Sequence, residues 1–214
     1  MVAIVIGGSG ATGRELVRQL VVDPRFSKVR VLLRRPYFEY HDKLEEIIVD
    51  FDKLFSFQDQ IRGDIAFSCL GTTLKDAGSK EAQWHIDYDY PFHFAKMSFE
   101  NGVTHFVLLS AAGVNAKSRI FYNRMKGSLE DAIKNIGFQQ LTILRPGFIE
   151  RPHSDRLGEK IGLKVINAFN KVGIFKQYAP IKTKLLAKAM LESVFTYKKA
   201  RQVLELKDIK AIIK

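Results

Sequence analysis

The first thirteen residues constrain the fold of this chain more than any other feature. An apolar run, Val2 to Ile6, leads directly into "GGSGATGRELV", where Gly7, Gly10 and Gly13 form a G-x-x-G-x-x-G pattern. Glycines there permit a tight turn and let backbone N–H groups approach a pyrophosphate, which the N-terminus of the following helix also favours. A second apolar run follows the helix, as this motif requires. The loop therefore predicts dinucleotide binding by Gly7, Ser9, Gly10, Ala11, Thr12 and Gly13.

Apolar runs alternate with helical segments along most of the chain. The runs are continuous and are not polar at every second position, which is typical of strands buried on both faces of a parallel sheet. The longest helical segment runs from Lys80 to Asn101. Helical crossovers between parallel strands cover both faces. The pattern predicts an α/β fold, a doubly wound parallel sheet of the Rossmann type. The expected strands are Val2 to Ile6, Val29 to Leu33, Ile47 to Val49, Ile65 to Cys69, His105 to Leu109, Leu141 to Leu144 and "QVLEL".

The alternation of apolar runs and helical segments ends after Pro146, where "GFIERPHSDRLGEK" is loop-like. Helical patterns return near Ile161 to Lys171 and Thr183 to Tyr197. Ligands of doubly wound sheets bind beyond the carboxyl ends of the strands. We therefore expect one NAD(P)-binding Rossmann domain over residues 1–214, with 147–180 as a small cap on the substrate side. Three cap residues either meet an anionic substrate or belong to a solvated loop: Arg151, His153 and Arg156.

Composition excludes several classes of protein. With 46% hydrophobic and 27% charged residues, the chain has the composition of an ordinary globular protein. Cys69 is the only cysteine, so an internal disulfide and a metal site built on cysteine pairs are excluded, and Cys69 is interpreted as a small buried hydrophobe. No apolar run approaches the roughly 20 residues that span a bilayer, and the first residues do not resemble a leader. A cytoplasmic location is expected.

The net charge of +11 comes from an excess of lysine and arginine in the second half of the chain. A basic second half suggests an anionic ligand, an acidic protein partner or weak attachment to nucleic acid or membrane, although a solubilising surface explains it equally well. The lysines are not interleaved with aromatic residues, as a stacking platform would require. No specific nucleic-acid partner is therefore expected.

The end of the second expected strand indicates which dinucleotide is bound. An NAD enzyme carries Asp or Glu there to hold the ribose 2′-hydroxyl, whereas this chain reads "VRVLLRRP". The planar guanidinium groups of Arg34 and Arg35 suit a 2′-phosphate, so NADP (NADPH) is favoured over NAD. Asp50 could accept from the adenine amino group. Leu70, Gly71 and Thr72 are expected beside the ribose.

"FYNRMKG" places Tyr122 four residues before Lys126, on one face of an expected helix. A lysine ammonium favours the phenolate of a neighbouring tyrosine, whose pKa is about 10 in a free side chain. Ser110 ends the preceding strand on the same edge as the glycine loop and could hold a substrate oxygen. "YAPIK" at Tyr178 to Lys182 has the same spacing but contains a proline that spoils a helix.

Together, the glycine loop, Ser110 and "YNRMK" resemble the short-chain dehydrogenase/reductase superfamily. "SCLGTT", "ENGVTHFVLLSAAGVN", "KGSLEDAI" and "LRPGFIERP" are similar to its atypical branch of NAD(P)H-binding proteins, which includes the Tat-interacting protein family. The resemblance implies that Ser110 positions the substrate, Tyr122 acts as general acid and base, and Lys126 activates Tyr122 and binds the ribose. Many relatives carry a second serine where this chain has Ala111.

The sequence thus predicts an NADP-preferring oxidoreductase that reduces or oxidises an unidentified carbonyl or alcohol. Two alternatives stay open: an NADPH-binding regulatory or redox-sensing protein without turnover, and a nucleotide-sugar epimerase or dehydratase. The latter usually needs a larger substrate domain than the expected cap. His85, Asp89 and His93 share a helical spacing that invites a metal reading, but Pro91 predicts an irregular first helical turn there, and no metal is expected.

Overall fold

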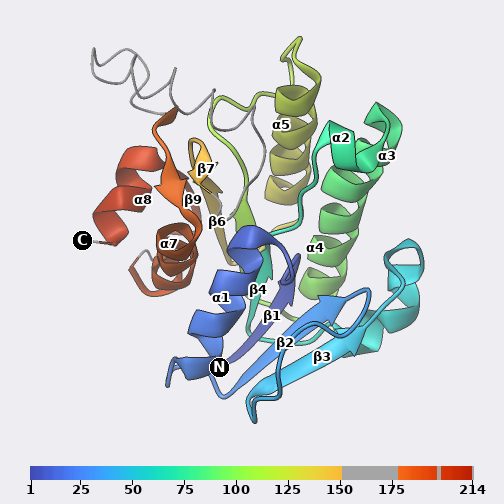
Figure 1. Cartoon of the computed structure of the whole chain (residues 1–214), viewed down its shortest axis with the longest axis vertical. Helices are drawn as coiled ribbons and strands as arrows, with labels where there is room; N and C mark the ends of the chain where they lie inside the picture. The colour runs from blue at the N-terminus through green and yellow to red at the C-terminus, as the bar shows by residue number, and fades with distance from the viewer. Residues whose placement is uncertain (151–177, 197–198, 214) are drawn as a thin grey trace.

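A seven-stranded parallel sheet forms the centre of the molecule in the computed structural model, which describes residues 1–150, 178–196 and 199–213. The strand order is β3-β2-β1-β4-β5-β6-β9 (Figure 1). The predicted doubly wound sheet is confirmed. Its strands are β1 (Val2–Ile6), β2 (Lys28–Leu33), β3 (Leu44–Ile48), β4 (Ile65–Ser68), β5 (His105–Leu109), β6 (Gln140–Arg145) and β9 (Arg201–Glu205). β7 (Ile149–Glu150) and β8 (Ile181–Lys182) form a separate two-stranded sheet.

Helices cover both faces of this sheet. Figure 1 shows α1, α7 and α8 on one side and α4 and α5 on the other. The helices on the first side are α1 (Ala11–Val22), α7 (Thr183–Thr196) and α8 (Leu206–Ile212). The helical segments between β3 and β6 are the 3₁₀ helix η1 (Phe51–Gln60), α2 (Leu74–Ala77), α3 (Lys80–Trp84), the π-helical turn η2 (His85–Asp89), α4 (Tyr90–Glu100) and α5 (Phe121–Lys134).

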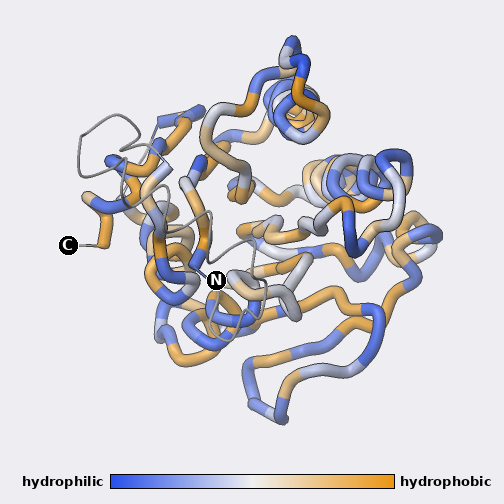
Figure 2. The backbone as a smooth tube through the Cα atoms, turned by 45° about the horizontal axis from the view of Figure 1, so that its top comes forward, coloured by the Kyte–Doolittle hydropathy of each residue, from blue (hydrophilic) through white to orange (hydrophobic). Residues whose placement is uncertain are grey.

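The alternation of side chains along the buried strands creates two cores. In β1, Ala3 and Val5 pack under α1 and α7, whereas Ile4 and Ile6 pack under α4. All four side chains are fully buried, which is why the strand sequence carries no polar alternation. Figure 2 shows this as hydrophobic colour along the central strands.

Two predicted elements differ clearly from the structure. β3 spans Leu44–Ile48 and not Ile47 to Val49, because Glu45 and Glu46 extend its pairing with β2 at the edge of the sheet. The long helix expected from Lys80 to Asn101 is interrupted by the π-helical turn η2, and Pro91 lies in the first turn of α4, directly after it. The expected helix near Ile161 to Lys171 lies outside the described residues.

Among the described residues, no helix is both long and apolar enough to cross a membrane.

Candidate dinucleotide-binding and catalytic site

The glycine loop joins β1 to α1 in a tight turn. Gly7 has a φ of 73°, in the left-handed region that favours glycine, and its carbonyl accepts a hydrogen bond of 3.0 Å from the Gly10 N–H. Gly13 lies beneath the turn, where a β-carbon would clash with the Gly7 carbonyl oxygen. The turn therefore leaves the first N–H groups of α1 facing the carboxyl edge of the sheet, where an anion is favoured.

We expect Gly13→Ala to open this turn. The added β-carbon would displace the Gly7 carbonyl, and overpacking of this kind costs about 1–3 kcal/mol of stability. NADPH affinity, measured by nicotinamide fluorescence, should fall at least about tenfold, or about 1.4 kcal/mol. In Gly10→Ala the β-carbon would meet only the Gly7 oxygen, at 3.2 Å, so this variant should lose less stability. Wild-type affinity in Gly13→Ala would contradict the assignment.

A cavity of about 390 Å³ lies at the carboxyl ends of β1, β2 and β4. The strand order reverses between β1 and β4, which is the position where doubly wound folds bind dinucleotides. Predicted cofactor residues line it: Gly7, Ser9, Gly10, Arg34, Leu70, Gly71 and Thr72. Phe51 and Tyr90, whose ring centroids are 5.4 Å apart, also line it and were not predicted. Asp50 instead caps η1, accepting from the Asp52 N–H.

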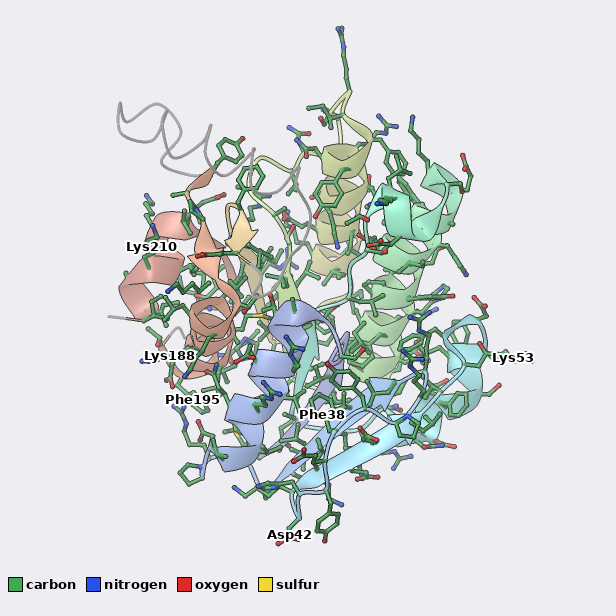
Figure 3. All side chains as sticks on the ribbon, in the orientation of Figure 1. Phe38, Asp42, Lys53, Lys188, Phe195 and Lys210 are labelled. Atoms are coloured by element: carbon green, nitrogen blue, oxygen red, sulfur yellow. The ribbon has the colours of Figure 1, made fainter. Side chains whose placement is uncertain are left out.

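The turn after β2 is tied to the glycine loop. The Glu46 carboxylate accepts hydrogen bonds from the backbone N–H groups of Tyr37 and Phe38, at 3.0 and 2.7 Å. Phe38, labelled in Figure 3, lies against Gly8, and the Tyr37 hydroxyl accepts from Arg14 at 3.3 Å. Arg34 and Arg35 are both exposed in this turn. Arg34 thus lines the larger cavity, and Arg35 follows it on the same exposed turn.

A second cavity, of about 160 Å³, continues along the same edge of the sheet to β5. Gly10, Ala11 and Thr12 line one side of it, and the three predicted catalytic residues line it as well: Ser110, Tyr122 and Lys126. The two cavities share Gly10 and residues 69–72. Tyr122 is 36% exposed, whereas Lys126 and Ser110 are buried. The structure therefore brings the glycine loop and the Ser, Tyr and Lys side chains to one place.

Ser110 makes a hydrogen bond that the sequence did not suggest. Its hydroxyl donates to the carboxylate of Glu130 on α5, at 2.6 Å, and Glu130 is fully buried. Arg145, at the end of β6, donates to both oxygens of this carboxylate, at 2.9 and 2.6 Å, and also contacts Glu205. The pKa of Arg145 is raised, chiefly by its hydrogen bond to Glu130. Because the Ser110 hydroxyl donates its only proton to Glu130, its oxygen can accept a hydrogen bond from a hydroxyl group bound in the cavity.

Lys126 faces a buried carboxylate on η2. Its ammonium nitrogen lies 3.7 Å from Oδ2 of Asp87, and both side chains are almost fully buried. Burial lowers the pKa of Lys126, and the charge of Asp87 opposes this shift. Burial raises the pKa of Asp87. The sequence does not single out Asp87, because neither aspartate of "HIDYDY" has a local partner that marks it as buried.

Cys69 lines both cavities but is poorly suited to act as a nucleophile. Burial raises the pKa of its thiol to about 12, and its sulfur lies 3.9 Å from that of Met190. A thiol with this pKa is protonated near neutral pH. The interpretation of Cys69 as a small apolar residue agrees with its packing against the core.

The histidines of α3 to α4 are accounted for by other contacts. The ring nitrogens of His85 lie 2.8 Å from Asp89 and from Asp52 on η1, and these hydrogen bonds raise its pKa. His93 packs on Phe55, with ring centroids 5.1 Å apart. In the part of the chain that the structure describes, no group of three His, Cys, Asp or Glu residues could hold a metal ion. Arg151, His153 and Arg156 lie outside that part.

Sequence comparison identifies a relative that matches almost the whole chain. No family model matches it. The rat protein HTATIP2 is 30% identical over 215 residues, covering 98% of this chain and 86% of the relative. The chain belongs to the HTATIP2 family. This family belongs to the atypical short-chain dehydrogenase/reductases, so the resemblance noted in the sequence is confirmed.

Fungal FMP52 proteins are further relatives of this HTATIP2-family chain. FMP52 of Saccharomyces cerevisiae is 33% identical over 163 residues, covering 74% of this chain and 71% of the relative. The fmp52 protein of Emericella nidulans is 32% identical over 176 residues, covering 78% and 76%. Both are named mitochondrial proteins, so the expected cytoplasmic location is wrong. Apolar runs and composition report on membrane spanning and not on the compartment that a protein enters.

Solved structures with low sequence identity share the fold of the family. WbmH of Bordetella bronchiseptica, in complex with NAD+, superposes with a TM-score of 0.71 at 15% identity, covering 95% of this chain and 74% of WbmH. UDP-glucose 4-epimerase of Thermotoga maritima gives a TM-score of 0.69 at 14% identity, covering 99% and 81%. At this identity the likeness shows the fold alone.

Proposed function

We propose that this HTATIP2-family chain is an NADP-preferring oxidoreductase that interconverts a carbonyl and an alcohol. The observation that carries the proposal is the shared cavity, where Ser110, Tyr122 and Lys126 meet residues of the glycine loop. The rat relative, matched over nearly the whole chain, and solved neighbours such as WbmH with bound NAD+ support a nicotinamide dinucleotide as the cofactor class.

The described residues fit such a cofactor. The larger cavity would hold the adenosine and pyrophosphate, with Gly7 and Gly10 leaving room for the phosphates and Phe51 and Tyr90 offering aromatic surface to the adenine. When bound, the nicotinamide supplies or accepts a hydride at the reacting carbon. Asp50 remains a candidate for the adenine amino group, because it directly precedes Phe51 of the cavity lining.

Tyr122 moves the proton in this proposal. It exchanges a proton with the substrate oxygen, while the positive charge of Lys126, one helical turn away, stabilises the phenolate. Lys126 would also hydrogen-bond the nicotinamide ribose. Ser110 accepts a hydrogen bond from the alcohol form of the substrate, because its own proton is donated to Glu130.

NADP preference is proposed from Arg34 and Arg35. Each hydrogen bond from a charged group to a phosphate contributes about 1.5–3 kcal/mol, so NADPH should bind at least about tenfold more tightly than NADH. Arg34→Ala combined with Arg35→Ala should erase this difference and leave NADH affinity nearly unchanged. Titration of the wild type and the double variant with both cofactors, followed by nicotinamide fluorescence, measures it.

A matched double variant serves as control. Arg62 precedes β4 and Arg201 begins β9, so both exposed arginines lie at the amino ends of strands, on the edge opposite the cavities. Arg62→Ala with Arg201→Ala removes the same charge and should keep the preference for NADPH. If both double variants lose the preference for NADPH equally, the preference comes from the overall charge of the protein and not from Arg34 and Arg35. Absence of binding by either cofactor in the wild type would overturn the proposal.

A further inference from the structure

The ammonium group of Lys126 is buried beside a carboxylate. The Lys126 side chain is 4% exposed, and its nitrogen lies 3.5 Å from the Leu70 carbonyl oxygen and 3.7 Å from Asp87 Oδ2, both at or beyond the usual length of a hydrogen bond. A buried charge is costly unless another charge or several hydrogen bonds compensate for it. The state of Lys126 therefore depends strongly on the carboxylate beside it.

Asp87 connects this lysine to the turn after β4. Its Oδ1 accepts a hydrogen bond of 2.6 Å from the Thr72 N–H, while Oδ2 faces Lys126 and accepts no hydrogen bond from the described residues. Gly71 lies against both groups: a β-carbon there would lie 3.7 Å from Oδ2 and 3.9 Å from the Lys126 nitrogen. Asp87 belongs to the π-helical turn η2, an irregularity that often occurs at functional sites.

Few other charged groups face Lys126. On α5, Tyr122 precedes it by one turn and Glu130 follows it by one turn, and the charge of Glu130 favours the ammonium. Glu130 is already paired with Arg145. The turn after β4 contributes the Leu70 carbonyl and the protonated Cys69 thiol, and the end of β5 contributes Ser110. Of the two carboxylates whose charges act on Lys126, Asp87 and Glu130, Glu130 is the one paired with an arginine.

We propose that Asp87 is a positioning residue that keeps Lys126 protonated and holds its ammonium against the turn at Gly71 and Thr72. The role in catalysis rests on the proposed function, because it acts through Lys126 on Tyr122. The charge relationship itself concerns only the protein and is tested without cofactor or substrate.

The test is the titration of Lys126 by NMR, with the ε-carbon labelled in lysine and its signal assigned from Lys126→Met. Asp87→Asn keeps an oxygen for the Thr72 N–H but removes the charge. We expect the Lys126 midpoint to fall by about one pH unit or more, a tenfold change in its dissociation constant. Without Asp87, burial is opposed only by Glu130, so Lys126 loses its proton at lower pH.

Asp89→Asn is the matched control. Asp89 lies two residues away on the same turn and pairs with the exposed His85, so its loss should leave the Lys126 midpoint unchanged. A shift in Asp87→Asn no larger than that in Asp89→Asn would overturn the proposal. If Asp87→Asn does not fold, the wild type decides: its Lys126 signal should show a second step where Asp87 titrates, and a single step would overturn the proposal.

NADPH binding separates this inference from the proposed function. In the wild type and in Asp87→Asn, affinity is measured across the pH range in which only the variant loses the Lys126 charge. As the pH rises, we expect NADPH affinity to fall at a lower pH in Asp87→Asn than in the wild type. A shifted Lys126 midpoint in a protein that binds no NADPH would support the charge relationship and reject the dinucleotide site. An unshifted Lys126 midpoint in a protein that binds NADPH would reject the charge relationship and support the dinucleotide site.

Discussion

Arg145→Met should lower the free energy of unfolding by about 3–5 kcal/mol, the usual cost of removing one partner from a buried ion pair. Arg145 donates to both oxygens of Glu130, whose side chain is 1% exposed. Methionine roughly preserves the aliphatic volume but leaves this carboxylate with only the Ser110 hydroxyl and the Lys134 ammonium, the latter at 3.6 Å. Urea denaturation followed by circular dichroism measures the loss.

Two further variants show whether the loss comes from the unpaired charge. Arg145→Met combined with Glu130→Gln removes both charges and should recover much of the stability, because no buried carboxylate is left uncompensated. Arg62→Met removes an exposed pair with Asp59 and should leave the stability unchanged within error. A loss in Arg145→Met no greater than that in Arg62→Met would show that Glu130 is adequately solvated without its arginine.

Tyr122→Phe should reduce turnover by a factor of about 10² to 10⁴ and leave NADPH affinity unchanged. The substitution removes only the hydroxyl from a side chain that lines the smaller cavity beside Lys126. Without it, no group in the proposed arrangement exchanges a proton with the substrate oxygen. The measurement is the loss of NADPH absorbance with a panel of aldehydes and ketones, including anionic ones because of the basic surface.

Tyr40→Phe is the control for this substitution, because Tyr40 is 91% exposed on the loop between β2 and β3. It should keep full turnover. If Tyr122→Phe turns over any compound as fast as the wild type, the assigned proton donor is wrong. If the wild type binds NADPH but turns over nothing, the regulatory alternative is favoured. The basic surface, with Lys188 and Lys210 on the same side of the molecule (Figure 3), is then where partner binding should be sought.

Local pattern in the sequence predicted most of the fold. A strand buried on both faces must be apolar at successive positions, so β1, β2, β4, β5 and β6 are recognisable without any partner. The edge strand β3 was misplaced by three residues at its start because an edge position tolerates Glu45 and Glu46. Pro91 indicated only that the helix is irregular near this residue. The sequence did not predict the π-helical turn η2 itself, because that turn depends on how the helix packs.

The sequence by itself determined the glycine turn and the common face of Tyr122 and Lys126, because both are set by residues close together in the chain. Only the tertiary structure decided that Glu130 binds Ser110 and Arg145, and that Asp87 faces Lys126. In the sequence, Glu130 is four residues from Lys134 and looks like half of a solvated helix pair. Burial turns the same carboxylate into a fixed acceptor, and burial depends on contacts between residues far apart in the chain.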